Sequence, residues 1–289
     1  MHFVEAKTLV SGRNGMNVYR GCAHGCVYCD SRSTCYQFTH PFEDIEVKRN
    51  APALLEGVLQ KRRKTCVIST GSMSDPYQPC EKELHLTRRC LEVIDRHGFG
   101  ASVITKSDLV LRDLKLFDSI NQKAKSVLQM TLTIADDALS RILEPNVCTT
   151  TRRYEVLKEF QKAHIPTVVW MTPILPFLTD TEENMRRILD YCFDADVKGI
   201  VCFSAGVTLR EGDREYYYQA LDRHFPGLSE EYRRTYGNAY EVLSPRHEAL
   251  MRLLRTECQR YGVLHDPDAC FRYIAALPEK SVQISLFEP

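Results

Sequence analysis

Short apolar runs alternate with amphipathic stretches along the first two thirds of the chain. Runs typical of buried strands fall at 16–19, 66–70, 101–105, 126–133, 167–171 and 200–203. Between them, apolar residues recur at helical spacing over 52–62, 87–96, 110–120, 151–164 and 181–195. Strands that alternate with helices form a parallel sheet covered by helices. We therefore predict an α/β fold, a partial (β/α)6 TIM-type barrel, because a closed barrel needs eight such units.

The alternation stops near residue 227. The segments 228–236 and 247–261 have helical apolar spacing, with no strand-like run beside them. We predict a barrel domain over 1–226 and a helical C-terminal extension over 227–289 that packs on the barrel. Thr181 precedes the helix predicted at 181–195 and is placed to cap its first turn.

Composition narrows the class of protein only a little. The 289 residues carry a formal net charge of zero, so global charge does not favour a nucleic-acid partner. No apolar run reaches the length of a membrane span, and the first residues lack the basic and apolar segments of a secretory signal. We expect a cytoplasmic protein with no membrane partner. In that setting its 12 cysteines are not expected to form a disulfide framework.

Three cysteines follow the first predicted strand with the spacing C-x3-C-x2-C: Cys22, Cys26 and Cys29. Three thiolates so close together can hold three irons of a cubane cluster and leave the fourth iron open to a small molecule. One alternative is a zinc site that adds Cys35, with His24 as a spare ligand. Zinc sites usually consist of two C-x2-C pairs, and this group is a triplet. A disulfide knot is the third possibility.

Polar residues follow the next predicted strands at the end where parallel folds bind ligands. The second strand runs into a segment that contains Gly71, Ser72, Ser74 and Asp75. The third strand ends at Lys106, whose ammonium can pair with a carboxylate, and the fourth ends at Thr131 and Thr133, whose hydroxyls can bind a sugar. The alternatives are an ordinary turn, a solvated lysine and β-branched strand residues.

With Tyr28, the cysteine triplet reads C-x3-C-x-aromatic-C and resembles the radical S-adenosylmethionine (SAM) superfamily. In that superfamily the open iron binds the amino and carboxylate groups of SAM, and reduction cleaves SAM to methionine and a 5′-deoxyadenosyl radical. Further segments resemble the narrower spore photoproduct lyase-like, or "DNA repair photolyase", family. They span about residues 12 to 205 and read GCAHGCVYC, SDPYQP with LTRRCLEV, ITKSDLVLRD, TIADDALSRILEP and TPILPFLTD.

The resemblance implies two cofactors, a [4Fe-4S] cluster on Cys22, Cys26 and Cys29, and SAM. It places Tyr28 near the SAM adenine and the segment with Gly71, Ser72, Ser74 and Asp75 at the methionine end. Lys106 would meet the SAM carboxylate, with Arg153 as a second candidate, and Thr133 would meet the ribose. It also implies a one-electron donor such as a ferredoxin or a flavodoxin.

One position departs from the lyase pattern. The lyase carries a hydrogen-donating cysteine near the start of the segment that reads SDPYQP here, and Ser72 occupies about that place. No cysteine lies between Cys66 and Cys80. The candidates that remain for a hydrogen donor are Cys35, Cys80 and Tyr77.

The C-terminal residues Gln283, Ile284, Ser285, Leu286 and Phe287 resemble the peptide with which bacterial polymerases and repair proteins bind the DNA sliding clamp. A polar anchor followed by a Leu-Phe pair suits an apolar pocket. The alternative is a terminal strand that covers the barrel floor. We predict a radical SAM enzyme that acts on nucleic acid, with two alternatives: a protein or small-molecule substrate, or a zinc-stabilised nucleic-acid-binding protein without catalysis.

Overall fold

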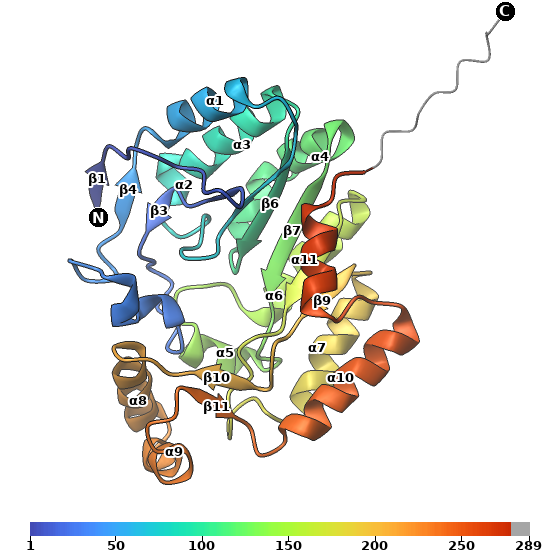
Figure 1. Ribbon diagram of the computed structural model, residues 1–289. Coiled ribbons are helices and arrows are strands. Elements are labelled where there is room, and N and C mark those ends of the chain that lie inside the picture. The colour runs from blue at the N-terminus through green and yellow to red at the C-terminus, as the bar shows by residue number, and fades with distance from the viewer. Residues whose placement is uncertain (279–289) are drawn as a thin grey trace, which may run out of the picture.

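The computed structural model describes residues 1–278 and is built around a six-stranded parallel sheet (Figure 1). The strands lie side by side in chain order: β2 (Gly15–Met16), β5 (Val67–Thr70), β6 (Gly100–Thr105), β7 (Ser126–Thr131), β8 (Thr167–Trp170) and β9 (Gly199–Val201). Five helices connect them: α1 (Ala51–Lys61), α3 (Leu86–Arg96), α4 (Leu114–Lys123), α6 (Thr150–Lys162) and α7 (Glu182–Asp194). The predicted α/β partial barrel is confirmed.

The outer face of the sheet packs against these helices. Met130, Val169 and Ile200 are partners in adjacent strands, so their side chains share one face, and all three are fully buried in the main core. The predicted N-cap of α7 is confirmed: the Thr181 hydroxyl accepts a hydrogen bond from the Asn184 backbone N at 3.1 Å. The helix predicted at 110–120 instead begins as a 3-10 turn, η3 (Asp108–Asp113), before α4.

The C-terminal helix α11 (Pro267–Ala275) packs on the opposite face of the sheet (Figure 1). Cys270 and Ile274 form a separate apolar cluster with Val127, Val168 and Val201 of β7, β8 and β9. Gly199 is required there, because a Cβ at this position would lie 2.9 Å from the Cys270 sulfur. The preceding helix, α10 (His247–Tyr261), joins the main core beside α7. The extension therefore completes the barrel on both of its faces.

Between β9 and α10 along the chain, residues form a small unit. It consists of the antiparallel pair β10 (Gly206–Thr208) and β11 (Glu241–Leu243) with helices α8 (Asp213–His224) and α9 (Leu228–Tyr236). The boundary predicted after residue 226 falls between α8 and α9, whose Tyr217 and Tyr232 hydroxyls are 3.0 Å apart. Because these helices share one apolar cluster with Tyr28, the unit packs on the cysteine loop.

The first predicted strand, 16–19, is divided between two sheets. Met16 pairs with β5, whereas β3 (Tyr19–Arg20) pairs with β4 (Glu46–Lys48), which also pairs with β1 (His2–Val4). The chain thus leaves the barrel sheet just before the cysteines. The shorter elements are η1 (Asp30–Arg32), η2 (Thr34–Tyr36), α2 (Glu81–Leu84) and α5 (Asp137–Leu143). Among residues 1–278, no helix has the length and apolar character needed to cross a bilayer.

The packing of α11 predicts a large effect of Ile274→Ala. Ile274 is 5% exposed, and removing a buried isoleucine side chain costs about 2–5 kcal/mol. Urea unfolding should show that loss in a single transition, because α11 shares a core with the sheet. Ile142→Ala, on an exposed side chain, should leave the transition in place. Equal transitions for both variants would contradict the packing of α11 on the barrel.

Candidate functional site

The three cysteines line one cavity of about 130 Å³ at the C-terminal ends of the first strands. Cys22 and Cys26 are buried and Cys29 is half-buried. The same cavity is lined by most of the other predicted cofactor residues, namely Gly71, Ser72, Ser74, Asp75 and Lys106, and also by His24 and Thr131. Segments after the first, second and third strands thus converge as the sequence predicted.

The surroundings of the three thiols can be compared with the three hypotheses for the triplet: an iron–sulfur cluster, a zinc site and a disulfide knot. All three thiols are free, so these cysteines form no disulfide knot. Around one tetrahedral zinc, sulfurs lie about 3.8 Å apart. Within residues 1–278, one group of three metal-ligating side chains brings its atoms within 4.8 Å of one another, and it does not contain these cysteines. Cys35 is exposed and lines no part of this cavity. Cys35, the fourth ligand of the zinc hypothesis, is thus not beside the triplet, and three thiols suit a cubane cluster with one open iron.

Electrostatics indicate that the buried thiols need a positive charge beside them. Burial raises the pKa of the Cys22 thiol to about 12, and burial also raises the pKa of Cys26. Bound metal, such as the iron of a cluster, would supply the positive charge that favours the thiolates. Lys106 is the nearby cation: burial disfavours its charge, but Cys26 and Glu144 act in the other direction, and the net pKa is raised.

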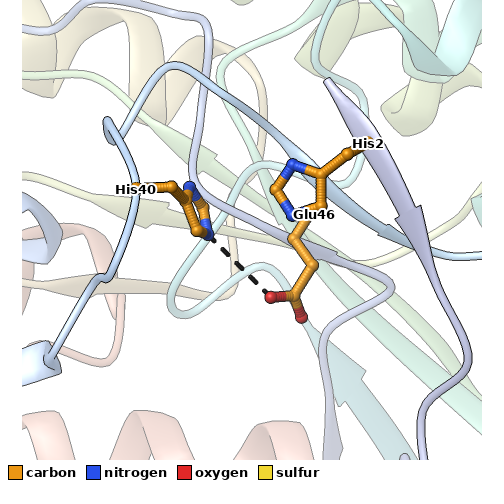
Figure 2. A group of neighbouring side chains, drawn as sticks. All are labelled: His2, His40 and Glu46. Carbon is orange, nitrogen blue, oxygen red and sulfur yellow. Dashed lines mark ion pairs between the residues drawn. The ribbon is translucent and has the colours of Figure 1, made fainter.

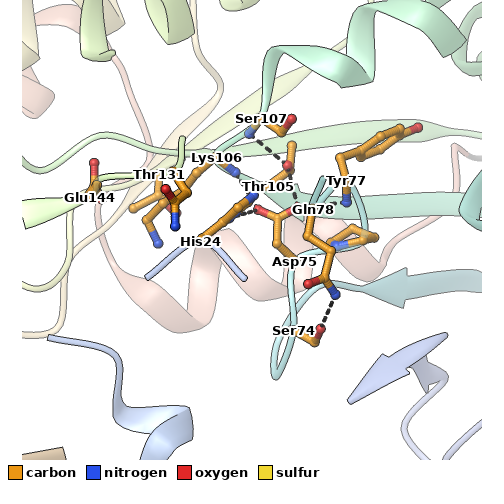
Figure 3. A network of polar contacts seen from close by, with 12 residues as sticks. His24, Ser74, Asp75, Tyr77, Gln78, Thr105, Lys106, Ser107, Thr131 and Glu144 are labelled. Carbon is orange, nitrogen blue, oxygen red and sulfur yellow. Dashed lines mark hydrogen bonds and ion pairs between the residues drawn. The ribbon is translucent and has the colours of Figure 1, made fainter. Parts of the chain in front are cut away.

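Asp75 is the centre of the hydrogen-bond network that shapes the cavity (Figure 3). Its Oδ1 accepts from the Thr105 hydroxyl at 2.7 Å and from the Tyr77 backbone N at 2.8 Å. Its Oδ2 accepts from the Lys106 backbone N at 2.8 Å and lies 3.4 Å from His24 Nδ1. The carboxylate therefore joins the loops after β5 and β6 to the cysteine loop. The predicted contact with SAM stays a prediction, and it would have to be made beside these internal bonds.

Ser74 and Gln78 hold the first cysteine in place. The Ser74 hydroxyl donates to the Gly21 carbonyl at 2.6 Å, and the Ala23 backbone N donates to Gln78 Oε1 at 3.0 Å. Gln78 was not among the predicted residues, although a fully buried glutamine must find such partners. Gly71 approaches the next strand so closely that a Cβ would lie 2.2 Å from the Ile104 carbonyl oxygen.

Arg153 is fully buried and lies outside the cavity lining. Its guanidinium pairs with Glu144 and donates to the Cys148 and Thr131 carbonyls at 3.0 and 2.9 Å. The Tyr28 hydroxyl donates to the same carboxylate. Glu144 neutralises the charge of Arg153, so Arg153 does not face the cavity as a free cation. It acts on the site indirectly, by positioning Glu144 and, through it, Tyr28. Glu144 was not among the predicted site residues. The signal in the sequence is an acidic residue directly after the segment that forms α5.

Burial raises the pKa of Glu144, but Arg153 and Lys106 lower it further than burial raises it, so this carboxylate is ionised at neutral pH. Its negative charge faces the Lys106 ammonium, which lies 5.7 Å from the centre of the Tyr28 ring. Arg153, Glu144 and Tyr28 together fix the position of the Lys106 ammonium.

The remaining predicted residues lie apart from the cavity. The Thr133 hydroxyl is buried and has no hydrogen-bond partner within the described part of the chain, whereas Thr131 lines the cavity. The Tyr77 hydroxyl donates to Asp113 at 3.0 Å, Cys80 is half-buried, and Cys35 lies 3.0 Å from Arg210 Nη1. The structure does not bring the three hydrogen-donor candidates into the site.

A second cavity of about 440 Å³ adjoins the first, and Cys29 and Lys106 line both. Its lining includes Trp170, the last residue of β8, and Phe203, two residues after β9. The rings of Trp170, Phe203 and Phe271 lie within 6.2 Å of one another, centre to centre. Phe203 is 55% exposed, so this aromatic cluster is open to a ligand.

The buried pair predicts that Glu144→Gln is strongly destabilising. Removing one partner leaves the Arg153 charge buried without compensation, at a cost of about 3–5 kcal/mol. The free energy of unfolding in urea measures the change. Glu155→Gln is the matched control, because Glu155 pairs with Arg152 on the surface, where such pairs contribute little. Similar losses for the two variants would contradict the role of the buried pair.

The chain is similar to proteins from bacteria and archaea. It is 30% identical to the uncharacterized protein Rv2578c of Mycobacterium tuberculosis over 248 residues. This match covers 83% of the chain and 72% of that protein. It is 35% identical over 171 residues to the uncharacterized protein MJ0683 of Methanocaldococcus jannaschii, covering 58% of this chain and 62% of that protein.

Among solved structures, spore photoproduct lyase complexed with dinucleoside spore photoproduct matches with a TM-score of 0.62 at 15% identity, over 91% of this chain and 80% of that one. At that identity the likeness concerns the fold. The model of the radical SAM superfamily matches residues 16–223. The cofactors of that superfamily are a [4Fe-4S] cluster and SAM, and the three thiols of the cavity are a suitable donor set for the cluster. The chain belongs to the radical SAM superfamily and has the fold of spore photoproduct lyase.

Proposed function

We propose that this radical SAM enzyme acts on a nucleobase of a nucleic acid, with DNA as the first candidate. The observation that carries the proposal is the exposed aromatic cluster of Trp170, Phe203 and Phe271 beside the cysteine cavity. A base stacked on an aromatic side chain gains about 1–3 kcal/mol. A cluster at this place would hold a base next to the residues that bind the cofactors.

The residues of the chain divide the work between two adjoining cavities. Cys22, Cys26 and Cys29 would hold the cluster, and SAM would bind beside Gly71 and Lys106. When bound, the cluster and SAM supply a radical able to take a hydrogen atom from an unactivated carbon. Lys106 places its ammonium for the SAM carboxylate, and Asp75 fixes the Lys106 backbone. A base on Phe203 would lie across Cys29 and Lys106 from the cofactors.

The partners are part of the same proposal. Spore photoproduct lyase has been solved with a dinucleoside lesion bound, and that ligand supports a nucleic-acid substrate for a chain of the same fold. A ferredoxin- or flavodoxin-type donor would supply the electron. The clamp-like residues Gln283, Ile284, Ser285, Leu286 and Phe287 lie outside the described residues, and docking on the sliding clamp remains a proposal from the sequence.

The enzyme class is tested by Cys26→Ala. The wild-type chain, reconstituted anaerobically, should hold about four irons and release 5′-deoxyadenosine from SAM with dithionite. Cys26→Ala should lose most of the iron and all SAM cleavage, because a cubane with two thiolate ligands is poorly held. Cys35→Ala is the control, since Cys35 is exposed and lines neither cavity. Full iron loading and SAM cleavage in Cys26→Ala would refute the cluster assignment.

The substrate class is tested by Phe203→Ala. Binding of a fluorescent single-stranded oligonucleotide by the cluster-loaded enzyme should weaken about five- to hundredfold, the range expected for one lost stacking partner. SAM cleavage without nucleic acid should not change, because Phe203 does not line the cysteine cavity. Tyr261→Ala removes an equally exposed aromatic that stacks on Phe193, and it should bind as the wild type does. If Phe203→Ala also bound as the wild type does, a protein or small-molecule substrate would be the better reading.

A further inference from the structure

A second group of metal-ligating side chains lies on the N-terminal sheet, away from the cysteine cavity (Figure 2). Strand pairing places His2 of β1 directly opposite Glu46 of β4, and Arg20 of β3 is opposite Glu46 on its other side. In paired strands such partners point to the same face. His2 and Glu46 are therefore neighbours because of the sheet register.

His40 reaches the same face from the loop that precedes β4. Its ring meets the ring of His2 edge to face, with centres 4.9 Å apart, and its Nε2 lies 3.9 Å from Glu46 Oε2 (Figure 2). That Nε2 atom is buried and has no hydrogen-bond partner among residues 1–278. A buried polar nitrogen without a partner calls for an explanation, such as an ion that it binds.

The other ring nitrogens are already engaged in the way that metal-binding histidines require. His2 Nδ1 lies 3.0 Å from Asp44 Oδ2, and His40 Nδ1 lies 3.0 Å from the Pro41 carbonyl oxygen. Both oxygens accept hydrogen bonds, so in the neutral imidazole that binds a metal each Nδ1 carries the proton and each Nε2 offers its lone pair. A carboxylate or carbonyl behind the ring is the usual support of a histidine ligand.

We propose that His2, His40 and Glu46 bind a divalent ion of the zinc type. Their ligand atoms lie within 4.8 Å of one another, and side-chain rotation would bring them to the spacing of about 3.4 Å that a tetrahedral zinc site needs. Two imidazoles and one carboxylate suit zinc better than calcium or magnesium, which prefer oxygen ligands. The His2 side chain is 40% exposed, so water can complete the fourth position.

Arg20 and Lys48 are cations beside Glu46, and the Lys48 ammonium donates to the Asn17 carbonyl at 3.0 Å. Arg20 Nη1 lies 3.9 Å from Glu46 Oε2, beyond hydrogen-bond distance. Its Nη2 donates to the Tyr36 and Gln37 carbonyls at 3.0 and 3.1 Å, so the guanidinium is anchored without Glu46. The Glu46 carboxylate remains available to an ion. On the far side of His2, Asp44 supports the ring and also pairs with the Met1 ammonium at 2.9 Å.

The position of the site suggests what the ion would do. His40 lies two residues before Phe42, whose carbonyl accepts from the Cys22 backbone N at 3.2 Å. The contact is so close that a Cβ on Gly21 would lie 2.4 Å from the Phe42 oxygen. An ion on His40 would fix the segment that supports the first cysteine of the triplet. The metal site lies apart from the proposed substrate cavity, so this proposal does not depend on the identity of the substrate.

The test uses the cluster-loaded full chain, in which iron already occupies the cysteine triplet. Equilibrium dialysis against zinc should show about one bound ion per chain, with nitrogen and oxygen neighbours at about 2.0–2.2 Å in zinc-edge X-ray absorption. Zinc should also raise the melting temperature. His40→Gln and Glu46→Gln should each weaken zinc binding at least about tenfold and abolish the shift, while keeping wild-type iron content.

His224→Gln is the matched control, because His224 is exposed on α8 and should bind zinc as the wild type does. The proposal is overturned if the cluster-loaded wild type binds no zinc. It is also overturned if the absorption spectrum shows sulfur neighbours at about 2.3 Å, since those would come from free cysteines. Unchanged zinc affinity in both His40→Gln and Glu46→Gln would have the same meaning.

Discussion

The cysteine loop depends on hydrogen bonds donated and accepted by other segments, because it forms hardly any regular structure of its own. Buried backbone groups must be paired, and here the partners come from several places in the sequence. The Gly21 carbonyl accepts from Ser74, the Ala23 amide donates to Gln78, and the Val27 amide donates to the Leu143 carbonyl at 3.0 Å. The loop can therefore take its shape only once the strands behind it have assembled.

The buried ion pair extends the same constraint to charge. Placing Arg153 and Glu144 in the interior costs desolvation energy that their attraction must offset, so such a pair is a weak source of net stability. What it provides is a fixed direction: the carboxylate orients Tyr28 and faces Lys106. A rigid arrangement of charge is what a site needs in order to hold a zwitterionic cofactor in one orientation.

The sheet separates packing from chemistry by its two faces. The outer face is apolar and carries the helices, while α11 packs on the other face against Val127, Val168 and Val201. Trp170 donates to Gln129 Oε1 at 2.7 Å, so these two polar groups inside the barrel are satisfied. The two cavities lie at the C-terminal strand ends, where the cysteines and the aromatic cluster are found.

The sequence by itself determined the six strands of the barrel sheet, the helices that connect them and the presence of a cysteine triplet after the first strand. Apolar periodicity and the spacing of Cys22, Cys26 and Cys29 are local properties, so they can be recognised without the fold. The sequence also predicted that Gly71, Asp75 and Lys106 lie near the triplet, because strand ends of a parallel sheet meet at one edge, and all three line the same cavity. Only the tertiary structure decided which polar side chains face the cavity and which support it.

Arg153 and Glu144 pair across a turn, Gln78 reaches back to a loop more than fifty residues earlier in the chain, and His2 meets Glu46 through strand register. Contacts of that kind are set by the packing of distant segments, and no periodicity in the chain encodes them.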